Sequence, residues 1–259
     1  MSRKFGIEIE ATGVQMAEVA AALNAAGIRT YVEGYNHSTK NHWKIVTDAS
    51  LSGQYAFELV SPILQGADGL CQVDTVGKVL TAIGAKVNKS CGLHVHVDAR
   101  DITNEQMKRV CKMWMKYESC FDSVMPESRK NNAFCMGIRT KYATLDAAFK
   151  AIDAARNLGD LRVAMNGVHG HPSRYHKLNL ESLLRHGTVE FRQHSGTVEA
   201  AKMLNWVELV TAFVDCAVTA KTIRATGADK FENLMAVTPV PSVRKFYRER
   251  RDYFAGATA

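Results

Sequence analysis

Three short segments of the chain alternate charged or histidine residues with apolar ones, and this pattern restricts the fold more than any other feature. They span residues 3–12, 92–98 and 188–194. Because successive side chains of a β-strand point to opposite faces, a period of two predicts strands with one polar and one apolar face. The predicted polar faces carry Glu8 and Glu10, then His94, His96 and Asp98, then Thr188, Glu190, Arg192 and His194.

The residue types on these faces indicate more than contact with water. A solvated face is the alternative interpretation of each strand taken alone, but such a face usually carries Lys, Thr, Ser and Gln. Glu, Asp and His are metal-binding types, and Arg binds phosphates. We therefore interpret the three faces as parts of a ligand site.

A fourth predicted strand, over residues 55–64, is nearly all apolar and contains Glu58. It should be buried, so this carboxylate needs a partner. If the four strands share one sheet, Glu58 converges with the three glutamates of the other faces, and four carboxylates at close range repel unless cations lie among them. Oxygen-rich ligation with one or two imidazoles favours Mg²⁺ or Mn²⁺ over Zn²⁺. Arg192, on the same face, suits a phosphate oxygen.

The composition is that of an ordinary globular protein, with 259 residues of which 46% are hydrophobic and 23% charged. This excludes disordered and fibrous proteins. No apolar stretch is long enough to span a bilayer and no signal peptide opens the sequence, so we expect a soluble protein without a membrane partner. Six cysteines without a Cys-x-x-Cys pair argue against a zinc ribbon or disulfide scaffold and favour the cytoplasm.

The net charge of +7 favours an anionic partner such as nucleic acid or a nucleotide. However, +4 of it lies after residue 220, where eight Lys or Arg stand against four acids. We predict a catalytic domain over residues 1–237 and a basic helical appendage over 238–259. A second basic segment, residues 128–132, is interpreted as a solvated loop.

Apolar spacing and capping signals predict the remaining elements. We expect further strands over 28–35 and 43–48, and helices over 15–26, 69–83, 145–157 and 199–225. A capping box at Thr103-Asn-Glu-Gln106 opens another helix that runs to about residue 124. Residues 175–181 and 187–194 are predicted to form a hairpin, and 167–172 a loop. Because strands and helices do not alternate in βαβ units, the predicted fold class is α+β, a mostly antiparallel sheet with helices over one face.

Five motifs, in this order, resemble the amidoligases of the carboxylate-amine ligase superfamily, which is related to glutamine synthetase and glutamate-cysteine ligase. They are Phe5-Gly-Ile-Glu-Ile-Glu10, Thr47-Asp-Ala-Ser-Leu51, Glu58-Leu-Val-Ser-Pro-Ile63, Cys91-Gly-Leu-His-Val-His-Val97 and Gly187-Thr-Val-Glu-Phe-Arg-Gln-His-Ser-Gly-Thr197. One such motif alone is weak, but five in order are specific. The resemblance covers roughly residues 3 to 215. It implies a glutamine-synthetase-like catalytic fold, with a curved sheet whose concave face holds divalent ions and ATP.

The resemblance also implies roles for individual residues. Glu10 and Glu58 would hold the ion nearer the carboxylate substrate, while Glu8, His94 and Glu190 would hold the ion that bridges the ATP phosphates. Arg192 would bind phosphate oxygens, with His96 close by, and we assign catalytic roles to Arg192, Glu58 and His96. The residues assigned to the nucleotide are Arg192, Lys177, Asn179 and Ser50. Ser50 follows Ala49, where the family pattern usually has Gly.

These assignments imply an ATP-dependent ligase. ATP would phosphorylate a carboxylate, and an amine would attack the acyl phosphate to give an amide, ADP and phosphate. The acid and amine are expected to be small molecules or peptides, and a modified nucleotide is a further candidate partner. ATP with Mg²⁺ or Mn²⁺ is the expected cofactor set.

Two alternatives come from other classes of protein. A metal-dependent hydrolase would use His94, His96 and Asp98 with Glu190, but that reading leaves Glu8 unexplained. A non-catalytic protein that binds nucleic acid is supported only by the positive charge.

Overall fold

The structure of the protein is a computed structural model that describes residues 3–130, 132–226 and 230–256. The chain divides into two compact units, of which the first contains Met1–His96 and His194–Glu208, and the second contains Val97–Gln193 and Leu209–Ala259. The chain passes from one unit to the other within β5 (Gly92–Asp98), β9 (Thr188–Ser195) and α8 (Ala200–Thr219). The predicted domain boundary at residue 238 falls inside the second unit and stays a prediction.

The strands of the first unit follow the order β2-β3-β4-β1-β5. Besides β5, they are β1 (Phe5–Ala11), β2 (Thr30–Val32), β3 (Trp43–Val46) and β4 (Phe57–Val60). β4 pairs antiparallel with both β1 and β3, whereas β2 pairs parallel with β3. This confirms the mostly antiparallel sheet. The strand predicted over 28–35 was too long, since only three of its residues are in β2.

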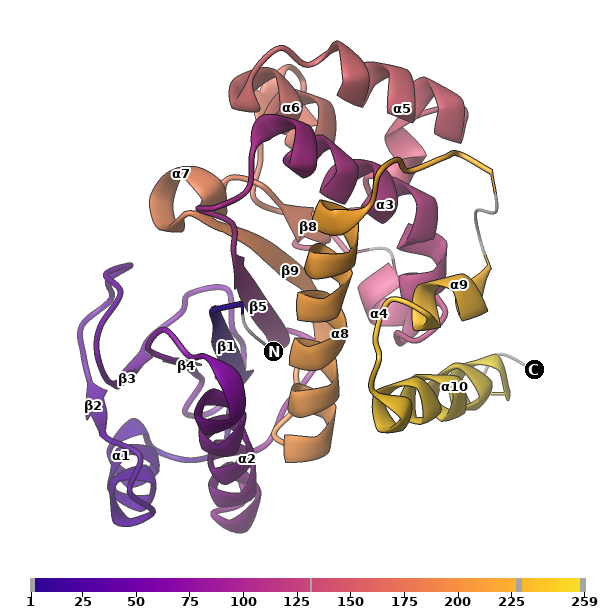
Figure 1. Cartoon of the computed structure of the whole chain (residues 1–259). Coiled ribbons are helices and arrows are strands. Elements are labelled where there is room, and N and C mark those ends of the chain that lie inside the picture. The colour runs from indigo at the N-terminus through magenta and orange to yellow at the C-terminus, as the bar shows by residue number, and fades with distance from the viewer. Residues whose placement is uncertain (1–2, 131, 227–229, 257–259) are drawn as a thin grey trace. The chain divides into compact units, whose positions relative to one another are not determined.

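The apolar face of β1 is buried, as the alternating pattern predicts. Ile7 and Ile9 are at most 1% exposed, and the helices α1 (Met16–Ala25) and α2 (Gly66–Ala82) bury apolar residues such as Leu23 in the same unit. Figure 1 shows α1 and α2 side by side next to these strands. Burial of the apolar face leaves the glutamates of β1 on the opposite face.

The packing of α2 against the first residues of α8 depends on a glycine. A Cβ atom on Gly77 would lie only 2.6 Å from the Cα atom of Ala200, so no other residue fits without a shift of backbone. Thr81, one turn further along α2, donates a hydrogen bond of 3.1 Å to the carbonyl oxygen of Val198. These contacts fix the segment that follows β9 within the first unit.

The second unit contains most of the helices and the antiparallel pair β8–β9, with Leu178 opposite Phe191. Besides parts of β5, β9 and α8, its elements are α3 (Asn104–Asp122), α4 (Glu127–Lys130), a 3-10 helix (Arg139–Lys141), α5 (Leu145–Ala154), α6 (Leu158–Asn166), β6 (Gly167–Val168), β7 (His171–Pro172), β8 (Leu178–Asn179), α7 (Ser182–His186), α9 (Phe231–Met235) and α10 (Pro241–Gly256). The β8–β9 pair confirms the predicted hairpin, although β8 is shorter than expected and α7 lies in the connection. The capping box of α3 is also confirmed.

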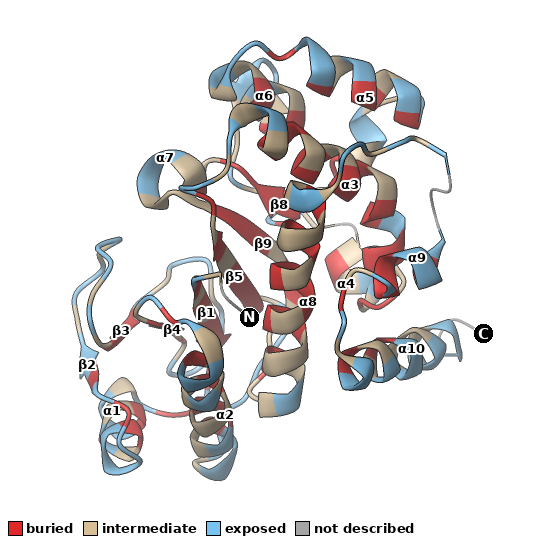
Figure 2. Ribbon diagram, viewed as in Figure 1, coloured by how far each residue is buried: buried red, intermediate tan, exposed pale blue. Residues whose placement is uncertain are grey.

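The core of the second unit is an aromatic cluster. The Trp114 ring of α3 stacks on Phe121 at 4.8 Å between centroids, and both rings contact Phe213 of α8 edge-on. Phe191 of β9 adds an edge-to-face contact with Trp114. Figure 2 shows β9 largely buried and the outer faces of α5 and α10 exposed. This cluster attaches β9 to α3 and α8, so the strand that carries Glu190 and Arg192 has a rigid support.

Several expectations are corrected. α8 ends at Thr219 and not at residue 225, and residues 167–172 form the short β6–β7 hairpin and not an irregular loop. The helix α6 was not predicted. Among the described residues, no helix combines the length and apolar character that crossing a membrane requires.

Candidate functional site

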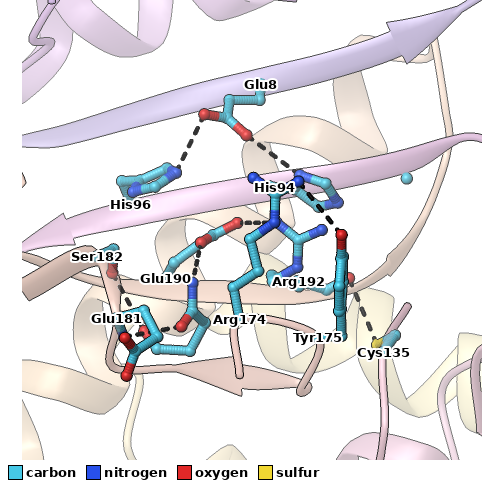
Figure 3. Close-up of polar contacts among 12 residues, drawn as sticks. Glu8, His94, His96, Cys135, Arg174, Tyr175, Glu181, Ser182, Glu190 and Arg192 are labelled. Carbon is cyan, nitrogen blue, oxygen red and sulfur yellow. Dashed lines mark hydrogen bonds and ion pairs between the residues drawn. The ribbon is translucent and has the colours of Figure 1, made fainter. Parts of the chain in front are cut away.

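Two histidines flank the carboxylate of Glu8 in the first unit (Figure 3). The Nδ1 atom of His94 lies 3.2 Å from Oε2 of Glu8, and the Nε2 atom of His96 lies 3.2 Å from Oε1. β1 and β5 supply these side chains from alternate positions, as the period of two predicts. The structure therefore brings the first two predicted polar faces together.

The electrostatic surroundings keep Glu8 ionised. Burial raises the pKa of its carboxyl, but the charge of His96 and hydrogen bonds from His94 and His96 outweigh burial and hold the pKa well below its usual range. A carboxylate that stays ionised and faces two imidazoles offers oxygen and nitrogen ligands in one place.

A second group consists of Glu10, Glu58 and His94. The register of β1 and β4 places Glu10 directly opposite Glu58. One ligand atom from each of these three residues lies within 4.8 Å of the other two, and Nε2 of His94 is 3.8 Å from Oε1 of Glu10. The other oxygen of Glu10 accepts a hydrogen bond of 2.5 Å from the backbone N–H of Gly92, which fixes the carboxylate.

The donor set of this group fits a hard divalent cation. Two carboxylates and one imidazole supply mostly oxygen, the type of ligand that Mg²⁺ and Mn²⁺ prefer, and free cysteines contribute nothing to the group. Two adjacent carboxylates also repel each other unless a cation lies between them. Glu10, Glu58 and His94 are thus the residues best placed to hold such an ion.

Lys44, which was not among the residues predicted for the site, is 3% exposed. It shares a row of the sheet with Glu8, because both lie opposite Val60. Its ammonium donates three hydrogen bonds of 2.9 Å, to both oxygens of Asn36 and to the carbonyl of Ser38. Burial lowers its pKa, and the nearby acids oppose that effect. The sequence does contain one indication of a buried cation here, a lysine within the apolar run Trp43-Lys-Ile-Val46.

In the second unit, Glu190 is a buried carboxylate with a partner on each oxygen. The guanidinium of Arg192 donates a hydrogen bond of 2.5 Å to Oε1, and the amide of Asn179 donates one of 2.6 Å to Oε2. The pairing of β8 with β9 places Asn179 directly opposite Glu190. Three predicted site residues therefore form one hydrogen-bonded group, of which Glu190 and Arg192 are labelled in Figure 3.

Lys177, assigned to the nucleotide, is 2% exposed and bonded to a carboxylate. Its ammonium donates a hydrogen bond of 2.5 Å to Oδ1 of Asp122, which also accepts one from Gln193. Burial raises the pKa of Asp122, whereas Lys177 and Gln193 oppose that rise. A role of Lys177 at the nucleotide stays a prediction, and its observed contact ties the residue before β8 to the end of α3.

The interpretation of residues 128–132 as a solvated loop was wrong for Arg129. This residue lies in α4 and is 4% exposed. Its guanidinium donates to the carbonyl oxygens of Gln193 and Arg192, at 3.1 and 2.5 Å. Arg129 thus positions the backbone that carries Arg192. No local pattern indicates this burial, because a basic residue in a polar segment is usually solvated.

The remaining predicted residues lie elsewhere. Ser50 is exposed in the first unit, and its backbone N–H donates to the side chain of Asp48 at 2.7 Å. Asp98 of the second unit is paired with Arg100 at 2.7 Å. Glu190 also belongs to the second unit, so its sharing of an ion with Glu8 and His94 stays a prediction.

Comparison with known proteins agrees with the resemblance seen in the motifs. A search of curated proteins found no match. The sequence model of the family described as "Putative amidoligase enzyme" matches residues 1–214, a range that contains all the candidate site residues above. Because this match covers well over half of the chain, the protein belongs to that amidoligase family, a family of ligases.

Proposed function

We propose that the protein is an ATP-dependent carboxylate-amine ligase that works through an acyl phosphate. The observation that carries the proposal is the group Glu10, Glu58 and His94, whose ligand atoms lie within 4.8 Å of one another in a chain that belongs to an amidoligase family. Such a group suits the divalent cation that accompanies ATP in phosphoryl transfer.

The chemistry explains why a ligase needs these residues. A carboxylate anion repels an amine, and oxide is a poor leaving group. In the proposed reaction a carboxylate oxygen attacks the γ-phosphorus of ATP, and the bond from that phosphorus to ADP breaks. The amine then attacks the acyl carbon, loses a proton, and phosphate departs with the former carboxylate oxygen. The products are an amide, ADP and phosphate.

The protein's part is to position groups and to neutralise charge. Glu10 and Glu58 would hold one divalent ion, and Glu8 and His94 would hold a second, as the family pattern implies. When bound, these ions would supply positive charge for the phosphate oxygens. Glu190 is proposed to take part in the same reaction, as the family pattern implies. Arg192 would donate hydrogen bonds to phosphate oxygens, because a planar guanidinium matches two of them at once.

The proposed substrates are a small-molecule or peptide carboxylate and an amine, with a modified nucleotide as a further candidate partner. The family match does not favour the hydrolase or the nucleic-acid-binding alternative. The basic helix α10 adds little support for nucleic acid, since Arg248 and Arg251 contact Glu232 and Arg250 donates to the carbonyl of Val124.

The test is phosphate release from MgATP in the presence of amino acids, polyamines and nucleobase amines, supplied singly and in acid–amine pairs. The expected result is release that requires MgATP, one acid and one amine together, with an amide detected by mass spectrometry. A Glu10→Gln variant should lose this release, and Glu18→Gln, an exposed glutamate of the same unit, should keep it. Phosphate release that water alone sustains, with no amide, would contradict the proposal.

A further inference from the structure

An exposed aromatic group lies in the second unit, next to the segment that leads into β8. Phe134 is 50% exposed, and its ring meets that of Tyr175 edge-to-face, with 5.6 Å between centroids and 84° between planes. The guanidinium of Arg174 lies over the Tyr175 ring at 5.2 Å from its centroid. Two aromatic rings and a guanidinium thus form one surface, here called the aromatic platform.

Backbone bonds hold this platform to the strands. The N–H of Met136 donates to the carbonyl of Tyr175 at 2.8 Å, and the N–H of Lys177 donates to the carbonyl of Met136 at 3.0 Å. The N–H of Arg192 in turn donates to the carbonyl of Lys177 at 2.8 Å. The platform is therefore an extension of the β8–β9 pair, which the aromatic core supports.

The platform lies on the face that carries Arg192. Asn179 bonds to Glu190 on that face. Figure 3 shows Arg174 and Tyr175 extending on the side of the strands where Glu190 and Arg192 lie.

Such an arrangement matches the parts of a nucleotide. Aromatic faces and guanidinium planes stack on heteroaromatic bases, and every base offers a π-face. A guanidinium binds phosphate oxygens, and Figure 3 shows Arg192 on the same side of the strands as Arg174 and Tyr175. We propose that the platform of Phe134, Arg174 and Tyr175 binds the base of the nucleoside triphosphate, which rests on the proposed function, while Arg192 faces its phosphates.

The experiment compares a ligand that has a base with one that lacks it. Calorimetry measures the affinity of the full-length chain for MgATP and for magnesium tripolyphosphate, in wild type, Tyr175→Ala, Tyr175→Phe and Phe134→Ala. Tyr253→Ala is the control, since Tyr253 is 71% exposed and lies on α10 of the same unit. Thermal unfolding checks that each variant is folded.

Tyr175→Ala should bind MgATP roughly 5- to 100-fold more weakly than wild type, because the variant loses a base stack. Phe134→Ala should show a smaller loss, and because its side chain is half exposed this variant gives a second measurement if Tyr175→Ala is unfolded. Tyr175→Phe and Tyr253→Ala should bind MgATP as wild type does. Tripolyphosphate affinity should be unchanged in all of them.

The outcomes separate this inference from the proposed function. Unchanged MgATP affinity in Tyr175→Ala and Phe134→Ala, or an equal loss for ATP and tripolyphosphate, overturns the platform and leaves the ligase proposal standing. Failure of the wild-type protein to bind MgATP overturns the ligase proposal, and the platform assignment with it.

Discussion

The guanidinium of Arg192 and the carboxylate of Glu190 lie two residues apart on β9 and are joined by a hydrogen bond of 2.5 Å. Both side chains are largely buried, with exposed fractions of 13% and 5%. The pair therefore keeps a cation and an anion out of water without an uncompensated charge. A phosphate that contacts Arg192 would find the guanidinium already oriented by Glu190.

Arg192→Lys should lower turnover although the charge is kept. A guanidinium donates two parallel hydrogen bonds, whereas an ammonium acts as a point charge, so the variant should lose about 10-fold or more in kcat. The loss should appear mainly in kcat if the contact tightens during phosphoryl transfer. Steady-state measurements of phosphate release give kcat and KM. Arg185→Lys, an exposed substitution on α7, is the matched control, and wild-type rates in both variants would assign Arg192 a structural role only.

Glu10→Gln should weaken Mn²⁺ and Mg²⁺ binding about 10-fold or more, because the amide carries no charge to attract the cation. Zn²⁺ should bind more weakly than Mn²⁺ to the wild-type protein if carboxylates dominate the site. Calorimetry with each metal tests both expectations, with Glu18→Gln as the unaffected control. If the wild-type protein prefers Zn²⁺, the imidazoles and not the carboxylates are the main ligands of the site.

The alternating pattern predicted the polar faces because a period of two is a local property of each strand. It placed Glu8 and Glu10 on one face of β1 and the buried Ile7 and Ile9 on the other. The register of β1 with β4 then pairs Glu10 with Glu58. The capping box of α3 was equally local. The five motifs located the family, which the match over residues 1–214 confirms.

What the sequence did not reveal depends on contacts between distant residues. Lys44 is buried because the loop around Asn36 and Ser38 folds back to accept its hydrogen bonds. Arg129 is buried because the carbonyls of β9 accept from it, more than sixty residues away. The local pattern around Lys44 and Arg129 does not show these acceptor groups. Lys44 was therefore not singled out, and Arg129 was assigned to a solvated loop.

His176 should make the stability of the chain depend on pH. Burial lowers the pKa of its imidazole, the hydrogen bond with the carbonyl of Ser173 opposes that effect, and the charge of Lys141 adds to it. The folded pKa is therefore below the unfolded value of about 6.5. Between the two values the unfolded chain binds more protons, so the free energy of unfolding should fall as the pH falls through this window.

His176→Gln removes this proton-binding group and should reduce that pH dependence. Urea unfolding at about pH 7.5 and about pH 5.5 gives the change in the free energy of unfolding for each protein. The change should be smaller in the variant than in wild type. An equal change in both proteins would show that other groups cause the acid sensitivity.

Tyr247→Ala should destabilise the second unit by about 3 kcal/mol, because the ring of Tyr247 is 0% exposed and its loss leaves a cavity under α10. Tyr253→Ala on the exposed side of the same helix should cost less than about 0.5 kcal/mol. Chemical denaturation measures both. Equal, small effects would show that α10 contributes little to the folded unit.

The fate of one oxygen atom tests the proposed intermediate. If ATP phosphorylates the carboxylate, the amine displaces phosphate together with a carboxylate oxygen, since no water enters the reaction. With an acid substrate labelled by heavy oxygen, mass spectrometry should therefore find one labelled oxygen in the released phosphate for each amide formed. The nucleotide product should be ADP. Amide formation with unlabelled phosphate, or with AMP and pyrophosphate, would replace the acyl phosphate by another route such as an adenylate.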